Sequence, residues 1–332
     1  MHRVTMVTRW STPPAWATRQ RALAALAVLG YGAFVVKVLL SLHGVPASRD
    51  LLVPLMLGGF LAVSITSVRR MRRLAVGLLL DWTPFVLALW LYDLIRGMAD
   101  GAWIGAQFAP QIRFDELVGG GTAPTIWLQQ HLWHGTSSVR WYDYATWAVY
   151  MSYFFGTTAV LAVLWWRSRA LFRRFAANVV LLAFVGCVTF VLYPAEPPWL
   201  AAQEGRIDDV QRLVAPIGGH VPLVSFDALW ETGTRYANNV AAMPSLHAAY
   251  TLLISLFLVR RLRSRWRHLL WLYPPAMAFA LVYTGEHYVA DIVAGWIYCA
   301  AVYAAIERAA GAWERRRSAH KWDPQTVPAE GA

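Results

Sequence analysis

Histidine and aspartate stand four residues apart in "TGEHYVADIVAG" (284–295), where His287 and Asp291 would share one face of a helix. A carboxylate in that position accepts a hydrogen bond from one imidazole nitrogen and leaves the other nitrogen available as a nucleophile. The spacing makes His287 a candidate nucleophile with Asp291 orienting its ring, although the same spacing taken alone is a weak signal.

A second polar cluster, formed by Pro244, Ser245 and His247 in "AAMPSLHAAYT" (241–251), stands at the head of an apolar stretch. Proline suits the first turn of a helix, and the free amides and dipole of that turn favour an anion. Taken alone, the cluster has two interpretations: Ser245 caps a structural helix, or the cluster binds an anionic substrate. Its occurrence together with the His287 cluster favours catalysis.

The elements that must position these clusters are membrane helices. Hydrophobic residues make up 58% of the 332 residues and charged residues only 15%, which is typical of a polytopic helical membrane protein. We expect an all-α bundle of about eight transmembrane helices. The predicted spans are 22–42, 51–67, 74–97, 143–166, 175–193, 244–260, 268–284 and 288–306.

The basic residues predict the orientation of this bundle. Of 30 lysines and arginines, 22 precede the first span, follow spans two, four and six, or occupy the tail. With eight spans these positions share one side, so the positive-inside rule places both termini in the cytoplasm. Both polar clusters then lie at the extracytoplasmic rim of the membrane, which we expect to be the plasma membrane.

Other classes of function fit the sequence less well. The net charge of +11 could suggest nucleic acid, but the basic clusters serve as topology signals beside anionic lipid, so no nucleic-acid partner is expected. No second acidic cluster with metal-ligand spacing accompanies the histidines, so we expect no metal and no cofactor. A non-enzymatic lipid-binding or transport protein remains the alternative. It would need polar residues deep in the spans, for which Asp81 and Lys37 are the candidates.

The motifs "MPSLH" and "HYVADIVAG" resemble two signature motifs of the type 2 phosphatidic acid phosphatase superfamily, over roughly residues 140–306. The resemblance implies a membrane enzyme that acts on lipid phosphates through a phosphohistidine intermediate. It implies that His287 is the nucleophile, that Asp291 orients it, that His247 protonates the leaving group and that Ser245 holds a phosphate oxygen.

Further segments are similar to the inositolphosphotransferase branch, which includes the inositol phosphorylceramide synthases. These segments are "YPAEPPW" and "LLLDWTPFVLALWLYDLIRG" (78–97). The similarity implies a lipid phosphate or phospholipid donor and a lipid or sugar alcohol as acceptor. The chemistry leaves phosphatase and transferase open, because water or an alcohol can attack a phosphohistidine. We divide the chain into an N-terminal segment with two transmembrane helices (1–74), the enzyme domain (75–310) and a basic cytoplasmic tail (311–332).

The chain departs from the superfamily pattern in its positive charges. The expected lysine motif is missing, and Leu281 stands where an arginine is expected. Phosphoryl transfer needs positive charge around the transferred oxygens, so arginines on the outer side must supply it. The candidates are Arg96, Arg140 and Arg235. Each could equally be an interfacial anchor, and Asp93 and Asp143 are possible ion-pair partners.

Overall fold

The structure is a computed structural model that describes residues 15–41, 55, 58–62, 68–98, 104–221 and 238–321. These residues form helices and connecting turns, with two isolated bridges, Gln107 to Ala195 and Ala195 to Ala241, as the β-structure recorded among them. The predicted all-α class is confirmed. The longer helices are α1 (Ala15–Ser41), α3 (Val68–Gly77), α4 (Thr83–Met98), α7 (Trp141–Arg167), α8 (Arg169–Leu192), α12 (Leu246–Val259), α13 (Tyr273–Tyr283) and α14 (Val289–Lys321).

Short helices complete the described chain. A π-helical turn, η1 (Leu78–Trp82), joins α3 to α4, and a 3₁₀ segment, η3 (Arg265–Leu272), precedes α13. The remaining short elements are α5 (Ala109–Val118), α6 (Pro124–Leu132), η2 (Thr136–Ser138), α9 (Pro198–Gln203) and α10 (Val214–Gly218).

Among the described residues, four segments are long and apolar enough to cross a membrane: Arg72–Met98, Trp141–Arg167, Arg169–Leu192 and Val289–Arg316. Two further predicted spans are shorter than expected. The span predicted at 244–260 is the 14-residue α12, and the one at 268–284 divides into η3 and the 11-residue α13. Two prolines begin α13, and proline favours the first turn over the interior of a helix. Most of the predicted span 51–67 lies outside the described residues.

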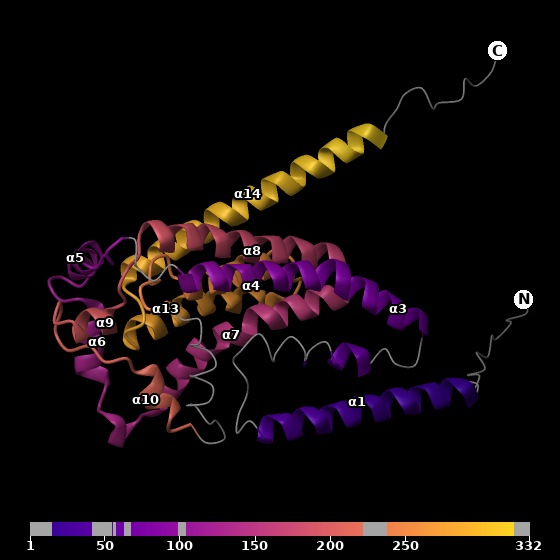
Figure 1. The fold of residues 1–332 in the computed structure, drawn as a ribbon, viewed down its shortest axis with the longest axis horizontal. Coiled ribbons are helices and arrows are strands. Elements are labelled where there is room, and N and C mark those ends of the chain that lie inside the picture. The colour runs from indigo at the N-terminus through magenta and orange to yellow at the C-terminus, as the bar shows by residue number, and fades with distance from the viewer. Residues whose placement is uncertain are drawn as a thin grey trace, which may run out of the picture.

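Helix α12 forms the centre of the bundle and contacts α14, α13, α8 and α7. Its sequence is apolar on all sides, which suits a helix enclosed by others. The rings of Phe175 and Phe257 pack edge to face with centroids 4.9 Å apart, beside the fully buried Leu182 and Leu253. In Figure 1, α4 and α8 lie side by side along the bundle, in agreement with their many contacts.

Two glycines allow helices to approach the start of α12. A Cβ added to Gly295 of α14 would overlap the Ser245 carbonyl oxygen, and one added to Gly186 of α8 would lie 3.1 Å from the Leu246 side chain. These contacts bring the first turn of α12 against α14 and the outer part of α8.

The two ends of the bundle differ in chemistry. One end gathers basic side chains around acidic ones: Arg174 and Arg261 pair with Glu307 at 3.2 Å and 3.0 Å. The other end is covered by α5, α6, α9 and α10, as Figure 1 shows. Asp81, a candidate for a polar site deep in the bundle, is instead ion-paired with Arg169 and Arg173 beside the α7–α8 turn.

The Gly295 contact generates a stability prediction. We expect Gly295→Ala to lower the unfolding free energy by about 1–3 kcal/mol, because backbone must move to admit the methyl group. Thermal unfolding in detergent measures the effect. Gly32→Ala in α1 is the matched control, since nothing lies within 4 Å of its added Cβ. Equal unfolding midpoints for the two variants would contradict the close packing of α14 on α12.

Candidate active site

His287 lies in the turn that joins α13 to α14. Gly285 has a φ of +77°, which suits glycine, and its added Cβ would lie 2.8 Å from the Gln211 carbonyl oxygen. The Leu281 carbonyl accepts from the amides of Glu286 (3.0 Å) and His287 (3.3 Å). This tight turn fixes the backbone of His287 and leaves its side chain 8% exposed.

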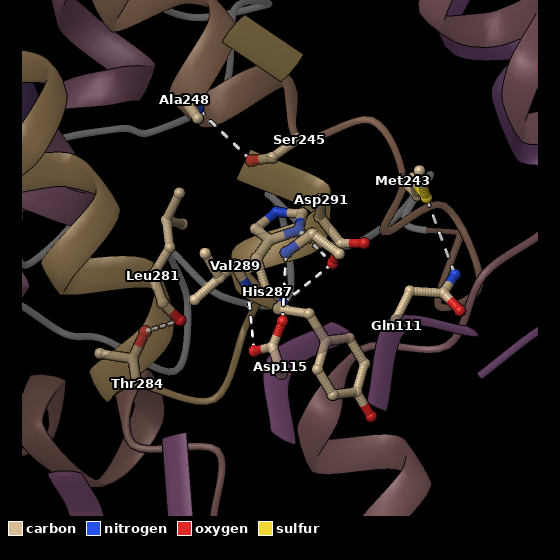
Figure 2. Close-up of polar contacts among 12 residues, drawn as sticks. Gln111, Asp115, Met243, Ser245, Ala248, Leu281, Thr284, His287, Val289 and Asp291 are labelled. Atoms are coloured by element: carbon tan, nitrogen blue, oxygen red, sulfur yellow. Dashed lines mark hydrogen bonds and ion pairs between the residues drawn. The ribbon is translucent and has the colours of Figure 1, made fainter. Parts of the chain in front are cut away.

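Asp291 lies in the first turn of α14 and is completely buried. Its Oδ2 is 3.4 Å from His287 Nδ1 and accepts the Tyr288 amide at 3.0 Å. The helix begins at Val289, so His287 precedes it instead of sharing a helical face with Asp291 as the spacing predicted. The two side chains meet because the turn folds His287 back over the first turn, and Nε2 is left for other chemistry (Figure 2).

Ser245 connects this turn to α12. Its amide donates to the Asp291 carbonyl at 2.9 Å, and its Oγ accepts the Ala248 amide at 3.3 Å as the N-cap of α12. Ser245 therefore caps the helix, as one of the two interpretations predicted. Its hydroxyl hydrogen still provides a donor, because the cap uses the oxygen as an acceptor.

His247 lies in the first turn of α12, in a cluster of aromatic rings. The ring of Tyr153 is 3.9 Å away between centroids, that of Tyr150 stacks at 5.2 Å, and that of His287 is 5.6 Å away. Within the described part of the chain, the buried His247 Nε2 has no hydrogen-bond partner. Two imidazoles thus lie close together, one oriented by a carboxylate and one with an unused ring nitrogen.

A second buried carboxylate, Asp115 of α5, supports the same turn from the outside. Its oxygens accept the amides of Val289 (3.0 Å) and Ala290 (3.1 Å), the first residues of α14, as Figure 2 shows. Burial raises the pKa of Asp115 to about 7, with a further contribution from the Asp291 charge, although the two amides oppose the shift. Sequence reasoning missed Asp115, since a lone aspartate in an amphipathic stretch carries no local signal.

Arg212 is a second residue that the sequence did not single out. It forms a two-point ion pair with Glu286, the neighbour of His287, with Nε to Oε1 at 2.7 Å and Nη2 to Oε2 at 3.1 Å. Its guanidinium lies 4.5 Å over the Trp199 ring. Burial acts to lower the pKa of Arg212, but the Glu286 carboxylate outweighs it and the pKa is raised.

The three predicted arginines lie in different places. Arg96 lies in the last turn of α4, with its side chain about a quarter exposed and 3.9 Å from Asp93. Arg140 is the exposed N-cap of α7, where its amide donates to Asp143 Oδ2 at 2.7 Å. Arg235 lies outside the described residues.

A metal centre has no obvious ligand set here. Over the ranges that the structure describes, no group of three or more His, Cys, Asp and Glu side chains is arranged to hold a metal ion.

Comparisons with known proteins agree on this region of the chain. A family model described as the PAP2 superfamily matches residues 122–305, which include every described residue of the histidine site except Asp115 and Arg96. The phosphoinositol dihydroceramide synthase of Bacteroides thetaiotaomicron is 30% identical over 142 residues, 40% of this chain and 45% of that protein. The match thus covers less than half of the relative's length. No solved structure matches significantly.

The raised pKa of Asp115 predicts a pH dependence of stability. The folded protein keeps a proton on Asp115 up to about pH 7, whereas the unfolded chain releases it near pH 4. The stabilisation is therefore complete below about pH 4 and is lost as the pH rises to about 7. We expect the unfolding free energy to fall by about 2–3 kcal/mol between pH 5 and pH 8 from this group.

Chemical unfolding of the wild type and Asp115→Asn at both pH values measures this contribution. The Asp115→Asn side chain is neutral throughout, so this variant should show a smaller pH dependence, while Asp209→Asn, at an exposed position, should behave as the wild type. Parallel pH profiles for wild type and Asp115→Asn would refute the assignment.

Proposed function

This chain belongs to the PAP2 superfamily, and on that premise we propose that it is a membrane-embedded lipid head-group phosphotransferase that acts through a phosphohistidine on His287. The family and the synthase relative support a lipid phosphatase or phosphotransferase. The observation that carries the proposal is the arrangement of two adjacent imidazoles, one held by Asp291 and the other with a buried, unpartnered Nε2.

In the first step, His287 Nε2 attacks the phosphorus of the donor, and a P–N bond forms as the P–O bond to the leaving group breaks. Asp291 holds the Nδ1 proton of His287 and stabilises the positive charge that develops on the ring. His247, protonated on Nε2, donates that proton to the leaving oxygen. Its unpartnered nitrogen supports this role, since a buried polar atom normally has a partner.

In the second step, the neutral His247 accepts a proton from the acceptor hydroxyl, whose oxygen attacks phosphorus. The P–N bond breaks, and His287 and the protonated His247 are regenerated. Water in place of an alcohol would give hydrolysis by the same movements of protons and electron pairs. Exclusion of water therefore decides between the two reactions, and the aromatic rings of Tyr150 and Tyr153 around His247 favour an alcohol acceptor.

Positive charge for the phosphoryl oxygens comes in this proposal from Arg212, which pairs with Glu286 beside His287, and from Arg96, whose carbonyl oxygen accepts from Asn238 in the segment that leads into α12. Arg212 is held in place by Glu286 and Trp199, and a fixed donor is more effective than a mobile one. The Ser245 hydroxyl and the first turn of α12 add donors. In this proposal, Arg212 thus supplies the positive charge that the buried Leu281 side chain lacks.

For the substrates, we propose a phosphoinositol-bearing lipid as donor and a ceramide-type alcohol as acceptor. The support is the similarity to the Bacteroides relative, which is a phosphoinositol dihydroceramide synthase. We place the basic end of the bundle and both termini in the cytoplasm and the histidines at the extracytoplasmic face of the plasma membrane, in line with the positive-inside rule.

We expect His287→Ala to abolish turnover, with a loss of at least roughly a thousandfold, because the variant lacks the ring nitrogen that forms the covalent intermediate in this proposal. Purified wild type and variant are assayed with phosphatidylinositol and with polyprenyl diphosphate, each with and without an alcohol acceptor. The assay follows free phosphate and transferred head group. His220→Ala, at an exposed histidine that contacts the Pro216 carbonyl, is the matched control and should keep full activity.

The products decide the class of reaction. Acceptor-dependent head-group transfer that is lost in His287→Ala supports a synthase, and release of phosphate without acceptor identifies a phosphatase. Equal behaviour of wild type and His287→Ala on every substrate would remove the catalytic role of the histidine.

Arg206 is the matched control for Arg212, because each arginine pairs with a glutamate and lies over an aromatic ring. Arg206 pairs with Glu196 at 3.1 Å and lies 3.9 Å over the Phe108 ring. We expect Arg212→Gln to lower kcat/KM by roughly 10²–10³, since it removes charge beside the transferred phosphoryl group, and Arg206→Gln to change it less than about threefold. Steady-state kinetics with the substrate identified above measures both. Similar losses in the two variants would show that Arg212 acts only in folding of the loop.

A further inference from the structure

A groove of about 520 Å³ lies at the opposite end of the bundle from the histidines. Its lining residues are Arg72, Arg73, Val76, Gly77, Leu80, Asp81, Arg169 and Arg173. The distance between the two sites follows from α8: Arg169 is its first residue, and Gly186 contacts Leu246 beside the histidine site. At about 1.5 Å per residue, the groove is roughly 25 Å along α8 from that contact, and it belongs to no part of the proposed reaction.

The groove has an excess of positive charge. Four arginines line it against one carboxylate, that of Asp81. Asp81 is fully buried and already engaged by Arg169, by Arg173 Nε at 2.7 Å and by Trp165 Nε1 at 3.1 Å. Three positive charges are therefore left without compensation by the lining residues.

Two of the four arginines, Arg169 and Arg173, are held in place around this groove by Asp81. The Arg169 guanidinium lies 4.0 Å over the Trp165 ring. A Cβ added to Gly77 would overlap Arg169 Nη1, so only glycine lets this guanidinium lie against α3. Fixed guanidinium groups suit a phosphate, because each offers paired N–H donors to its oxygens.

The surface around the groove is apolar. Val76, Leu79 and Leu80 are 47%, 66% and 64% exposed, and they belong to the candidate span Arg72–Met98. A soluble anion would use only the arginines, whereas a lipid would place its phosphate among them and its acyl chains along these side chains. We propose that this groove binds the phosphate head group of an anionic membrane lipid, as a site separate from the histidine site.

The test uses the full-length protein, purified in detergent and stripped of lipid. It is incubated with phosphatidylglycerol, with phosphatidylcholine or with inorganic phosphate, and retained ligand is counted by native mass spectrometry after a fixed wash. The variant is Arg72→Gln/Arg73→Gln, since both side chains are exposed on α3 and carry no core packing. Arg263→Gln/Arg265→Gln, at exposed positions near the start of η3, removes the same charge elsewhere.

We expect the wild type and the Arg263/Arg265 control to retain phosphatidylglycerol and the Arg72/Arg73 variant to retain roughly tenfold less. Unfolding midpoints equal to that of the wild type show that the variant is folded, and the single variants Arg72→Gln and Arg73→Gln should give intermediate losses. Equal retention by wild type and Arg72→Gln/Arg73→Gln, equal retention of phosphatidylcholine, or binding of inorganic phosphate alone would each overturn the proposal. Because the readout is binding, it is independent of whether the histidine site is catalytic.

Discussion

Asp291 makes the contacts on which the histidine site depends. Its carbonyl accepts the Ser245 amide, and one carboxylate oxygen meets both the Tyr288 amide and His287 Nδ1. One residue thus joins the start of α14 to the start of α12, the two helix ends that carry the histidines. A fully buried carboxylate is tolerated only when its charge is compensated, so the same bonds that hold the turn also fix the orientation of the His287 ring.

The outer loops complete this arrangement from outside the bundle. Asp115 accepts the first amides of α14, and Arg212 pairs with Glu286 beside His287. The Leu213 amide also donates to the Thr284 carbonyl at 3.1 Å, which ties the loop carrying Arg212 to the end of α13. These bonds hold Arg212 beside Glu286, the neighbour of His287 in the chain.

The bundle separates its charges between two ends. Around Asp81 and Glu307, arginines from α3, α8 and the α12–η3 connection gather into ion pairs and the basic groove. Around His287, the carboxylates of Asp115, Glu286 and Asp291 are buried.

The sequence by itself determined the all-α membrane class and the two polar clusters, because apolar length and residue spacing are local properties. It also predicted that His287 and Asp291 meet, although the helix they were expected to share begins only at Val289. Tertiary structure decided what depends on distant residues: the shortening of α12 and α13, the support of α14 by Asp115 across more than 170 residues, and the pairing of Arg212 with Glu286 beside His287. Such contacts form between segments far apart in the chain, so no local pattern records them.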